Sequence, residues 1–321
     1  MEHGDFKYVF GPVVSRRLGR SLGVDVVPFK TCTYDCIYCQ LGRTTCLTLE
    51  RGDFVPLDEV IAELKRKIES GVAADYITIA GSGEPTLYSR LGELIHGIKK
   101  LTTIPVAVLT NGSLLWDADV QKSLLEADVV IPSLDASTPE SYRTVNRPCA
   151  DIPFDKMIGG LVAFRERFGG QYWLEVLLLQ DVAENENEVE RLAGQVARIR
   201  PDRVQLHTVA RPSPGGEARP ATRECLERIA LRLGPNAKVV MPSNDAHSLD
   251  ATGPAAEAPL HEVSETDIFN LLLRHPCTVA DIAAGLHADT TAVQRSLDAL
   301  LIRQAVRKEN RNGETFYLAL I

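Results

Sequence analysis

Short apolar runs alternate with amphipathic segments from residue 22 to about residue 241. Most of these runs are apolar on both faces, which is typical of buried parallel strands. Strands that alternate with helical segments indicate repeated βα units around a parallel sheet. The pattern predicts six strands, at residues 22–29, 76–80, 106–110, 129–134, 172–179 and 203–209.

Apolar residues at helical spacing fill the segments between these strands. Gly71 is placed to end the first helix. The first helical set comprises Val60, Ile61, Leu64 and Ile68, and the second comprises Leu87, Leu91, Leu94, Ile95 and Ile98. Six units are fewer than the eight of a closed barrel, so we expect an α/β fold built on a partial (β/α)6 TIM-like barrel. Functional residues are then expected at the carboxyl ends of its strands.

The pattern changes near residue 242. Residues 242–261 are rich in Pro, Ala, Ser and Asp without a period, which is typical of a linker. Residues 262–321 then show three helical patterns and two β runs, 305–309 and 315–318, with a hairpin signal between them. We therefore predict a barrel domain at 1–241, a linker at 242–261 and a small C-terminal winged helix-turn-helix domain at 262–321.

Charge changes the expectation for that second domain. The chain has 321 residues and a formal net charge of -8, so a phosphate backbone is repelled on average. Residues 262–321 hold six Lys and Arg against eight Asp and Glu, and only the predicted wing, with Arg307, Lys308 and Arg311, is locally positive. DNA binding is therefore not expected, because its usual footprint is basic. Protein contact, RNA docking and a scaffolding role stay open.

Hydropathy and cysteine usage indicate the cellular setting. The start of the chain has no basic segment followed by a long apolar one, and no later stretch is long enough to span a bilayer. We expect a cytoplasmic protein without a membrane partner. Three of the seven cysteines fall within eight positions, which favours metal ligation over a disulfide framework.

The clustered cysteines are spaced C-x3-C-x2-C in the segment KTCTYDCIYCQLGRTT. One compact loop of this kind can place three thiolates on three irons of a cubane and leave the fourth iron without a nearby protein ligand. The alternative is a structural zinc loop with Cys46 as the fourth ligand, although zinc usually prefers paired C-x2-C hooks.

With Tyr38 before the third cysteine, this motif resembles the signature of the radical S-adenosylmethionine (radical SAM) superfamily. The resemblance implies that Cys32, Cys36 and Cys39 bind a 4Fe–4S cluster, and that the amino and carboxylate groups of S-adenosylmethionine chelate its open iron. It implies reductive cleavage of this cofactor to a 5'-deoxyadenosyl radical, which abstracts hydrogen from a substrate. A flavodoxin- or ferredoxin-like electron donor is the implied partner.

Polar residues at several predicted strand ends extend the resemblance. The turn Gly81-Ser82-Gly83-Glu84-Pro85 looks like the family's Gly-Gly-Glu-Pro motif, whose backbone contacts the methionyl amino group. Turns and helix caps are the alternative for each residue taken singly. The cofactor-binding residues implied in this way are Tyr38, Gly83, Glu84, Asn111, Ser133 and Asp135.

Residues 8–45 and the block SLDASTPESYRTVNRP are similar to the branch that contains the tRNA wybutosine enzyme 4-demethylwyosine synthase. That branch implies RNA as the leading substrate. The synthase resembles a two-cluster enzyme with cysteines upstream of the signature, whereas no cysteine precedes Cys32 here. It also resembles an enzyme that holds pyruvate on a lysine, for which Lys30 is the candidate and a solvated cation the alternative.

Basic residues near the predicted strands are candidates for substrate binding, since they form charge-assisted hydrogen bonds to phosphate or carboxylate. They are Arg16, Arg17 and Arg20, and, at the end of the last strand, His207 and Arg211. Solvated loops, structural ion pairs and a core histidine are the alternatives. A small phosphorylated or carboxylated metabolite is therefore the second substrate class. The sequence identifies no catalytic side chain, and a cluster that senses redox state for a DNA-binding regulator is a further hypothesis.

Overall fold

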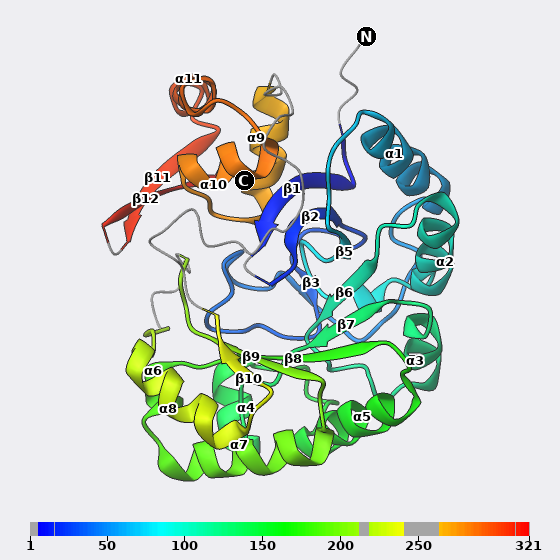
Figure 1. Ribbon diagram of the computed structural model, residues 1–321, viewed down its shortest axis with the longest axis vertical. Coiled ribbons are helices and arrows are strands. Elements are labelled where there is room, and N and C mark those ends of the chain that lie inside the picture. Colours follow the sequence, from blue (N-terminus) through cyan, green and yellow to red (C-terminus); the bar gives the residue numbers. More distant parts are fainter. Residues whose placement is uncertain (1–5, 16, 212–217, 241–262, 312, 321) are drawn as a thin grey trace.

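The computed structural model describes residues 6–15, 17–211, 218–240, 263–311 and 313–320. The predicted linker and Arg16 therefore lie outside the described residues. A curved eight-stranded sheet forms the centre of the molecule, in the spatial order β1-β2-β5-β6-β7-β8-β9-β10 (Figure 1). Its strands are β1 (Val9–Ser15), β2 (Gly19–Val24), β5 (Tyr76–Ile79), β6 (Val106–Thr110), β7 (Val129–Pro132), β8 (Gln171–Leu177), β9 (Arg203–His207) and β10 (Ala237–Val239).

All six predicted strands are present, and neighbours from β2 to β10 pair in parallel. The prediction of six strands was too low, because β1 joins one edge antiparallel to β2 and β10 joins the other. Pro12 lies within β1 and has no amide hydrogen to donate, which suits an edge strand. The proline also interrupts the strand pattern in the sequence, so β1 was not predicted. The first predicted strand, 22–29, begins earlier and ends at Val24.

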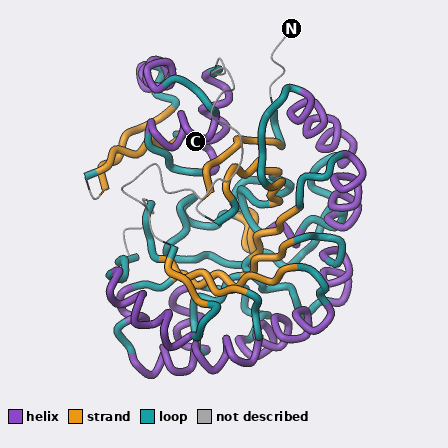
Figure 2. Tube along the Cα trace, viewed as in Figure 1, coloured by secondary structure: helices purple, strands orange, loops and turns teal. Residues whose placement is uncertain are grey.

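Helices line the outer side of this curved sheet (Figure 2). They lie in the segments between successive strands, and most bury one apolar face, as βα units require. They are α1 (Leu57–Glu69), the 3-10 turn η1 (Pro85–Leu87), α2 (Leu91–Leu101), α3 (Ala118–Leu124), α4 (Pro139–Val145), α5 (Phe154–Arg167), α6 (Gln180–Ala183), α7 (Glu186–Ile199) and α8 (Arg223–Leu233). Gly71 follows α1 with φ +83°, as expected of the residue that ends a helix. The partial barrel is therefore confirmed.

The inside of the barrel is filled at the amino ends of the strands. Leu18, from the turn between β1 and β2, is 2% exposed and packs with Ala107, Val129, Ile131 and Trp173. Since these residues come from β6, β7 and β8, the turn reaches across the barrel. This apolar cluster forms the floor beneath the inner space of the barrel.

Residues 263–311 and 313–320, here called the C-terminal module, contain three helices and a hairpin. They are α9 (Glu265–Arg274), α10 (Val279–Leu286), α11 (Thr290–Ile302), β11 (Val306–Arg311) and β12 (Glu314–Ala319). Thr278 caps α10 as predicted, in a capping box with Asp281. The elements match the predicted pattern, and their assignment as a winged helix stays a prediction.

The module packs on the β1 edge of the sheet (Figure 1). Phe10 of β1 belongs to the module's own apolar core, together with Ile268 and Leu271. Gly285 approaches the backbone of Pro12 so closely that an added Cβ would lie 2.6 Å from its carbonyl oxygen. Within the described residues, no helix has the length and apolarity needed to cross a membrane.

Candidate active site

The three clustered cysteines lie in the loop that leaves the carboxyl end of β2. At its base, β3 (Thr31–Cys32) pairs in parallel with β4 (Cys46–Leu47). The loop is also fastened to the end of α4, because Ile37 N donates to Val145 O at 3.0 Å. Backbone hydrogen bonds on both sides thus fix the path of the cysteines.

The three thiols lie in one partly buried site. Burial, followed by the nearby Glu84, raises the pKa of Cys32 to about 12. Burial, followed by Cys32, raises the pKa of Cys36 well above its usual value, and burial also raises the pKa of Cys39. Since thiolates are the metal ligands, a bound cation would reverse these shifts. The mutual influence of the thiols indicates that they lie close together.

Two side-chain amides donate to these sulfurs. Asn111 Nδ2 lies 3.5 Å from Cys32 Sγ, and Asn146 Nδ2 lies 3.6 Å from Cys36 Sγ. Hydrogen bonds to cysteine sulfur are among the interactions that tune iron–sulfur clusters. Asn111 therefore lies beside the cysteines, and Asn146 joins it from the end of α4.

The cysteine loop supplies the three thiolates that a cubane with one open iron requires. Across the described ranges, no three His, Cys, Asp or Glu side chains converge as ligands of one metal ion. Three thiolates that each bind a different iron are spread further apart than thiolates that share one ion. Cys46, the fourth ligand of the zinc alternative, is exposed.

Glu84 joins two of the turns at the carboxyl ends of the strands. Its side chain is buried and accepts from Thr86 N at 3.0 Å, Thr86 Oγ1 at 2.6 Å, Thr110 Oγ1 at 2.6 Å and Asn111 N at 2.7 Å. Burial raises the pKa of Glu84 in spite of these four donors. The carboxylate therefore holds the turn after β5 against the turn after β6.

Gly83 allows that turn to touch the cysteine loop. A Cβ on Gly83 would lie 1.8 Å from Thr31 O. The backbone itself bonds across this contact, since Glu84 N donates to Thr31 O at 3.1 Å. Only glycine has room at this position.

Asp135 organises the other side of the loop. One oxygen accepts from Leu177 N at 2.9 Å, and the other accepts from Asn146 Nδ2 at 3.0 Å and from the Tyr38 hydroxyl. Burial raises the pKa of Asp135. Ser133 lies nearby in sequence, half-buried just past the end of β7. Tyr38 and Asp135 thus meet between the cysteine loop and β8.

A cavity of about 390 Å³ lies between the cysteine loop and the floor formed by Leu18. Cys36, Tyr38 and Cys39 line one end, and Arg17 and Leu18 line the other. Its wall combines both edges of the sheet, since residues of β1 and the residue that follows β10 contribute. The cavity therefore places the inner space of the barrel in contact with two of the clustered cysteines.

Charged groups gather at the deep end of this cavity. Arg17 Nη1 and His207 Nε2 both lie in ion-pair range of Glu175 Oε1, the latter at 2.6 Å. Although burial alone would raise it, the pKa of Glu175 is held well below its usual value by Arg17 and then His207. Arg211 lines the same cavity. With two arginines and a histidine against one carboxylate, the cavity favours an anion.

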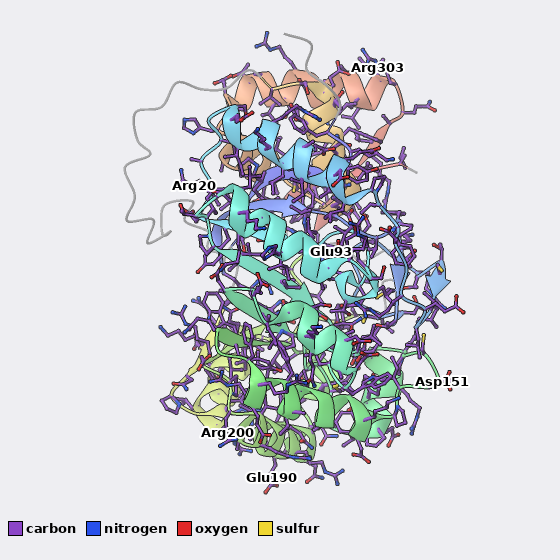
Figure 3. All side chains as sticks on the ribbon, turned by 90° about the vertical axis from the view of Figure 1, so that its right-hand side faces the viewer. Arg20, Glu93, Asp151, Glu190, Arg200 and Arg303 are labelled. Carbon is purple, nitrogen blue, oxygen red and sulfur yellow. The ribbon has the colours of Figure 1, made fainter. Side chains whose placement is uncertain are left out.

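Two of the other predicted residues lie outside the cavity. Arg20 is near the start of β2, at the amino ends of the strands, and pairs with Asp75 at 3.2 Å. Figure 3 shows Arg20 and Asp151, which lies between α4 and α5, on opposite sides of the molecule. Lys30 places its amine 5.3 Å from the Phe29 ring, and its charge partly offsets the burial that raises the pKa of Cys39, so it stays near the cysteines.

Sequence reasoning missed three residues of this site: Asn146, Glu175 and His275. Glu175 carried a usable signal, since it is a charged residue inside an otherwise apolar strand. Asn146 lies in the segment SLDASTPESYRTVNRP, where nothing in the sequence distinguishes it from its polar neighbours. His275 belongs to the C-terminal module, and no local pattern indicates its contact with the barrel.

Comparison with known proteins agrees with this geometry. Residues 26–194 match the Radical SAM superfamily. A GTPase Obg of Brachyspira hyodysenteriae is 42% identical over 311 residues, which cover 97% of this chain and 45% of that protein. The chain thus spans less than half the length of this relative. A UPF0026 protein of Synechocystis sp. is 39% identical over 210 residues, covering 65% of this chain and 78% of that protein.

Among solved structures, a radical SAM methyltransferase from Sphaerobacter thermophilus superposes with a TM-score of 0.55 at 18% identity. The match covers 68% of this chain and 65% of that chain, and it supports the fold alone. The family match spans more than half of the sequence and includes all three clustered cysteines. This chain therefore belongs to the radical SAM superfamily, whose enzymes use a 4Fe–4S cluster and S-adenosylmethionine.

Proposed function

We propose that this protein reductively cleaves S-adenosylmethionine and abstracts hydrogen from a small carboxylated or phosphorylated substrate bound inside the barrel. The observation that carries the proposal is one cavity lined both by Cys36 and Cys39 and by Arg17, His207 and Arg211. A radical formed at the cluster acts over contact distance, so the substrate must share a space with it.

In this proposal Cys32, Cys36 and Cys39 hold the cluster, and Asn111 and Asn146 donate to two of their sulfurs. A cluster held there would supply the electron, taken from the external donor, that cleaves the sulfonium of S-adenosylmethionine to methionine and a 5'-deoxyadenosyl radical. Glu84 and Gly83 position the turn that the family uses for the methionyl group, as the sequence motif implies.

Tyr38, Ser133 and Asp135 are proposed as further cofactor contacts on the β7 side of the loop. Asp135 accepts from the Tyr38 hydroxyl and from Leu177 N, so a cofactor there meets an ordered polar wall. A flavodoxin- or ferredoxin-like protein is the proposed electron donor. The half-exposed cysteine loop offers such a donor a short approach to the cluster.

The cavity supports a small oxyanion over RNA. Its volume of about 390 Å³ is in the range of small-ligand sites. Arg17 and Arg211 offer planar donors suited to carboxylate or phosphate. The wybutosine branch and RNA modification rest on the motifs alone, so an RNA substrate becomes an outcome of the experiment.

The first experiment replaces Cys32, Cys36 and Cys39 singly by Ala in anaerobically reconstituted protein. We expect loss of the cluster's visible absorbance and at least a 100-fold fall in dithionite-driven 5'-deoxyadenosine formation. Cys46→Ala is the matched control, since Cys46 borders the same loop but is exposed. The proposal fails if a triple variant still binds iron and cleaves the cofactor.

A second experiment identifies the substrate class. Reconstituted protein is incubated with separate deuterated pools of RNA and of small metabolites, and deuterium in 5'-deoxyadenosine is measured. Transfer from a small anionic compound supports the proposal, whereas transfer from RNA replaces it with RNA modification. Promoter footprinting without 5'-deoxyadenosine would instead favour the regulator hypothesis.

A further inference from the structure

The carboxyl end of α9 brings the C-terminal module into the substrate cavity. His275, the first residue after α9, lines that cavity beside Arg17, His207 and Arg211. Its ring lies 5.8 Å from Phe10 of β1. A residue some 235 positions beyond Gln40 in sequence therefore meets the cysteine loop, as their hydrogen bond shows.

Two further polar contacts fasten the module around this point. Arg274 Nε donates to Asp25 Oδ2 at 2.8 Å in a buried ion pair, and the same carboxylate accepts from Ser82 N and Oγ. On the far side, Arg311 Nη1 of β11 donates to the carbonyl of Arg211 at 2.6 Å. The module thus joins the β1 edge to the segment after β9 and covers the side of the cavity between them.

The hydrogen-bond partners of His275 determine its tautomer. Gln40 Nε2 lies 2.7 Å from His275 Nδ1, and Arg211 Nη1 lies 3.4 Å from the same atom. Both partners are donors, so Nδ1 accepts and the hydrogen of the neutral ring resides on Nε2. Burial, followed by Arg211 and Arg274, lowers the pKa of His275 to about 3, which keeps the ring neutral.

We propose that the C-terminal module completes the substrate site, and that His275 donates its Nε2–H to an oxyanion group of the substrate that Arg17 and Arg211 also bind. This inference rests on the proposed function and adds a specific contact to it. His275 then selects among oxyanions by shape, because its single N–H donor points in a fixed direction, whereas the arginines supply the positive charge.

The test measures oxyanion affinity in the full-length, cluster-loaded protein by calorimetry at constant ionic strength. Inorganic phosphate and malonate are the two probes, so that phosphate and carboxylate recognition are separated. We expect His275→Leu to weaken the better probe about tenfold, the usual size for a lost bond to a charged acceptor. His275→Gln, which can place an amide donor near the position of Nε2, should recover most of this loss.

Arg303→Gln is the matched control, since Arg303 lies on the outer side of the module (Figure 3) and pairs with Glu265. It should bind the probe like the wild type, and iron content verifies folding in every variant. Equal affinity in His275→Leu and wild type, or no probe binding by the wild type, overturns the inference. The proposed function fails separately, through absence of 5'-deoxyadenosine while probe binding persists.

Discussion

Two buried polar clusters of the barrel differ in the groups that surround their carboxylates. Around Glu84, one carboxylate accepts from four donors that belong to the turns after β5 and β6. Around Glu175, Arg17 Nη1 and His207 Nε2 instead lie in ion-pair range of one carboxylate oxygen, and both residues line the cavity. A carboxylate saturated by neutral donors is complete without a ligand, whereas basic groups that line a cavity can also contact an anion.

The difference assigns a structural role to the Glu84 cluster and a binding role to the Glu175 cluster. The Glu84 cluster joins the turns after β5 and β6 to each other, so its loss should cost stability. The Glu175 cluster lies at the deep end of the cavity, so its loss should alter the affinity for an anion more specifically. The following predictions test this contrast, starting with the largest effect.

Glu84→Ala should lower the free energy of unfolding by about 3–5 kcal/mol, because several buried donors lose their acceptor. Urea denaturation of the protein without cluster measures this change. Glu93→Ala is the control, since Glu93 is exposed and pairs only at the surface with Arg90, within a single helix turn. Such a pair should be worth under about 1 kcal/mol. Equal costs for the two variants would contradict the contrast.

Gly83→Ala should cost about 1–3 kcal/mol and lower the iron content after reconstitution, because the added methyl overlaps Thr31 O. Iron analysis and urea unfolding check both effects. Gly159→Ala in α5 is the matched control, since a Cβ there meets no atom within 4 Å. Alanine also favours a helix, so the control should be neutral or slightly stabilising. A Gly83→Ala protein with normal iron content would show that the contact is not needed.

Arg17→Gln should weaken phosphate or malonate binding about tenfold, while its stability changes by about 1–3 kcal/mol because Glu175 keeps His207 as a partner. Calorimetry and urea unfolding separate these effects. Arg20→Gln should leave affinity unchanged, because Arg20 pairs with Asp75 at the amino ends of the strands. An equal loss of affinity in both variants would indicate a diffuse charge effect rather than a binding site.

The smallest effect concerns pH. The folded-state pKa of Glu175 is depressed, so its ionisation stabilises the fold above its ordinary value of 4.5 and this contribution fades as pH falls toward the folded value. The stability advantage of the wild type over Glu175→Gln should therefore shrink by about 1 kcal/mol between pH 6 and pH 4. Urea midpoints at both pH values check this. A pH-independent difference would mean that Glu175 is not held ionised by Arg17.

Local signals predicted the repeated units well. The apolar runs identified six strands, and the clustered cysteines identified the loop that leaves the first of them. Polar residues at the strand ends led to Asn111, Glu84 and Asp135, and the structure places all three beside the cysteine loop, while their cofactor role stays a prediction. The edge strand β1 escaped because Pro12 interrupts its pattern.

Contacts between residues far apart in the sequence could not be predicted from such local patterns. Arg17 and Arg20 differ by three positions, yet the turn between β1 and β2 sends Arg17 into the barrel and leaves Arg20 beside Asp75. His275 reaches Gln40 through packing between the module and β1, which no local pattern encodes. Separate treatment of the two regions therefore missed the residue that they share.

The Leu18 floor has a consequence for turnover. The Leu18 side chain packs against Ile131 and Trp173, so the inner space of the barrel is closed toward the amino ends of the strands. In the proposed function, a product leaves past the cysteine loop or beside the module, along the route by which the next substrate enters. Product release and substrate entry then cannot overlap, so slow release would limit the rate of turnover.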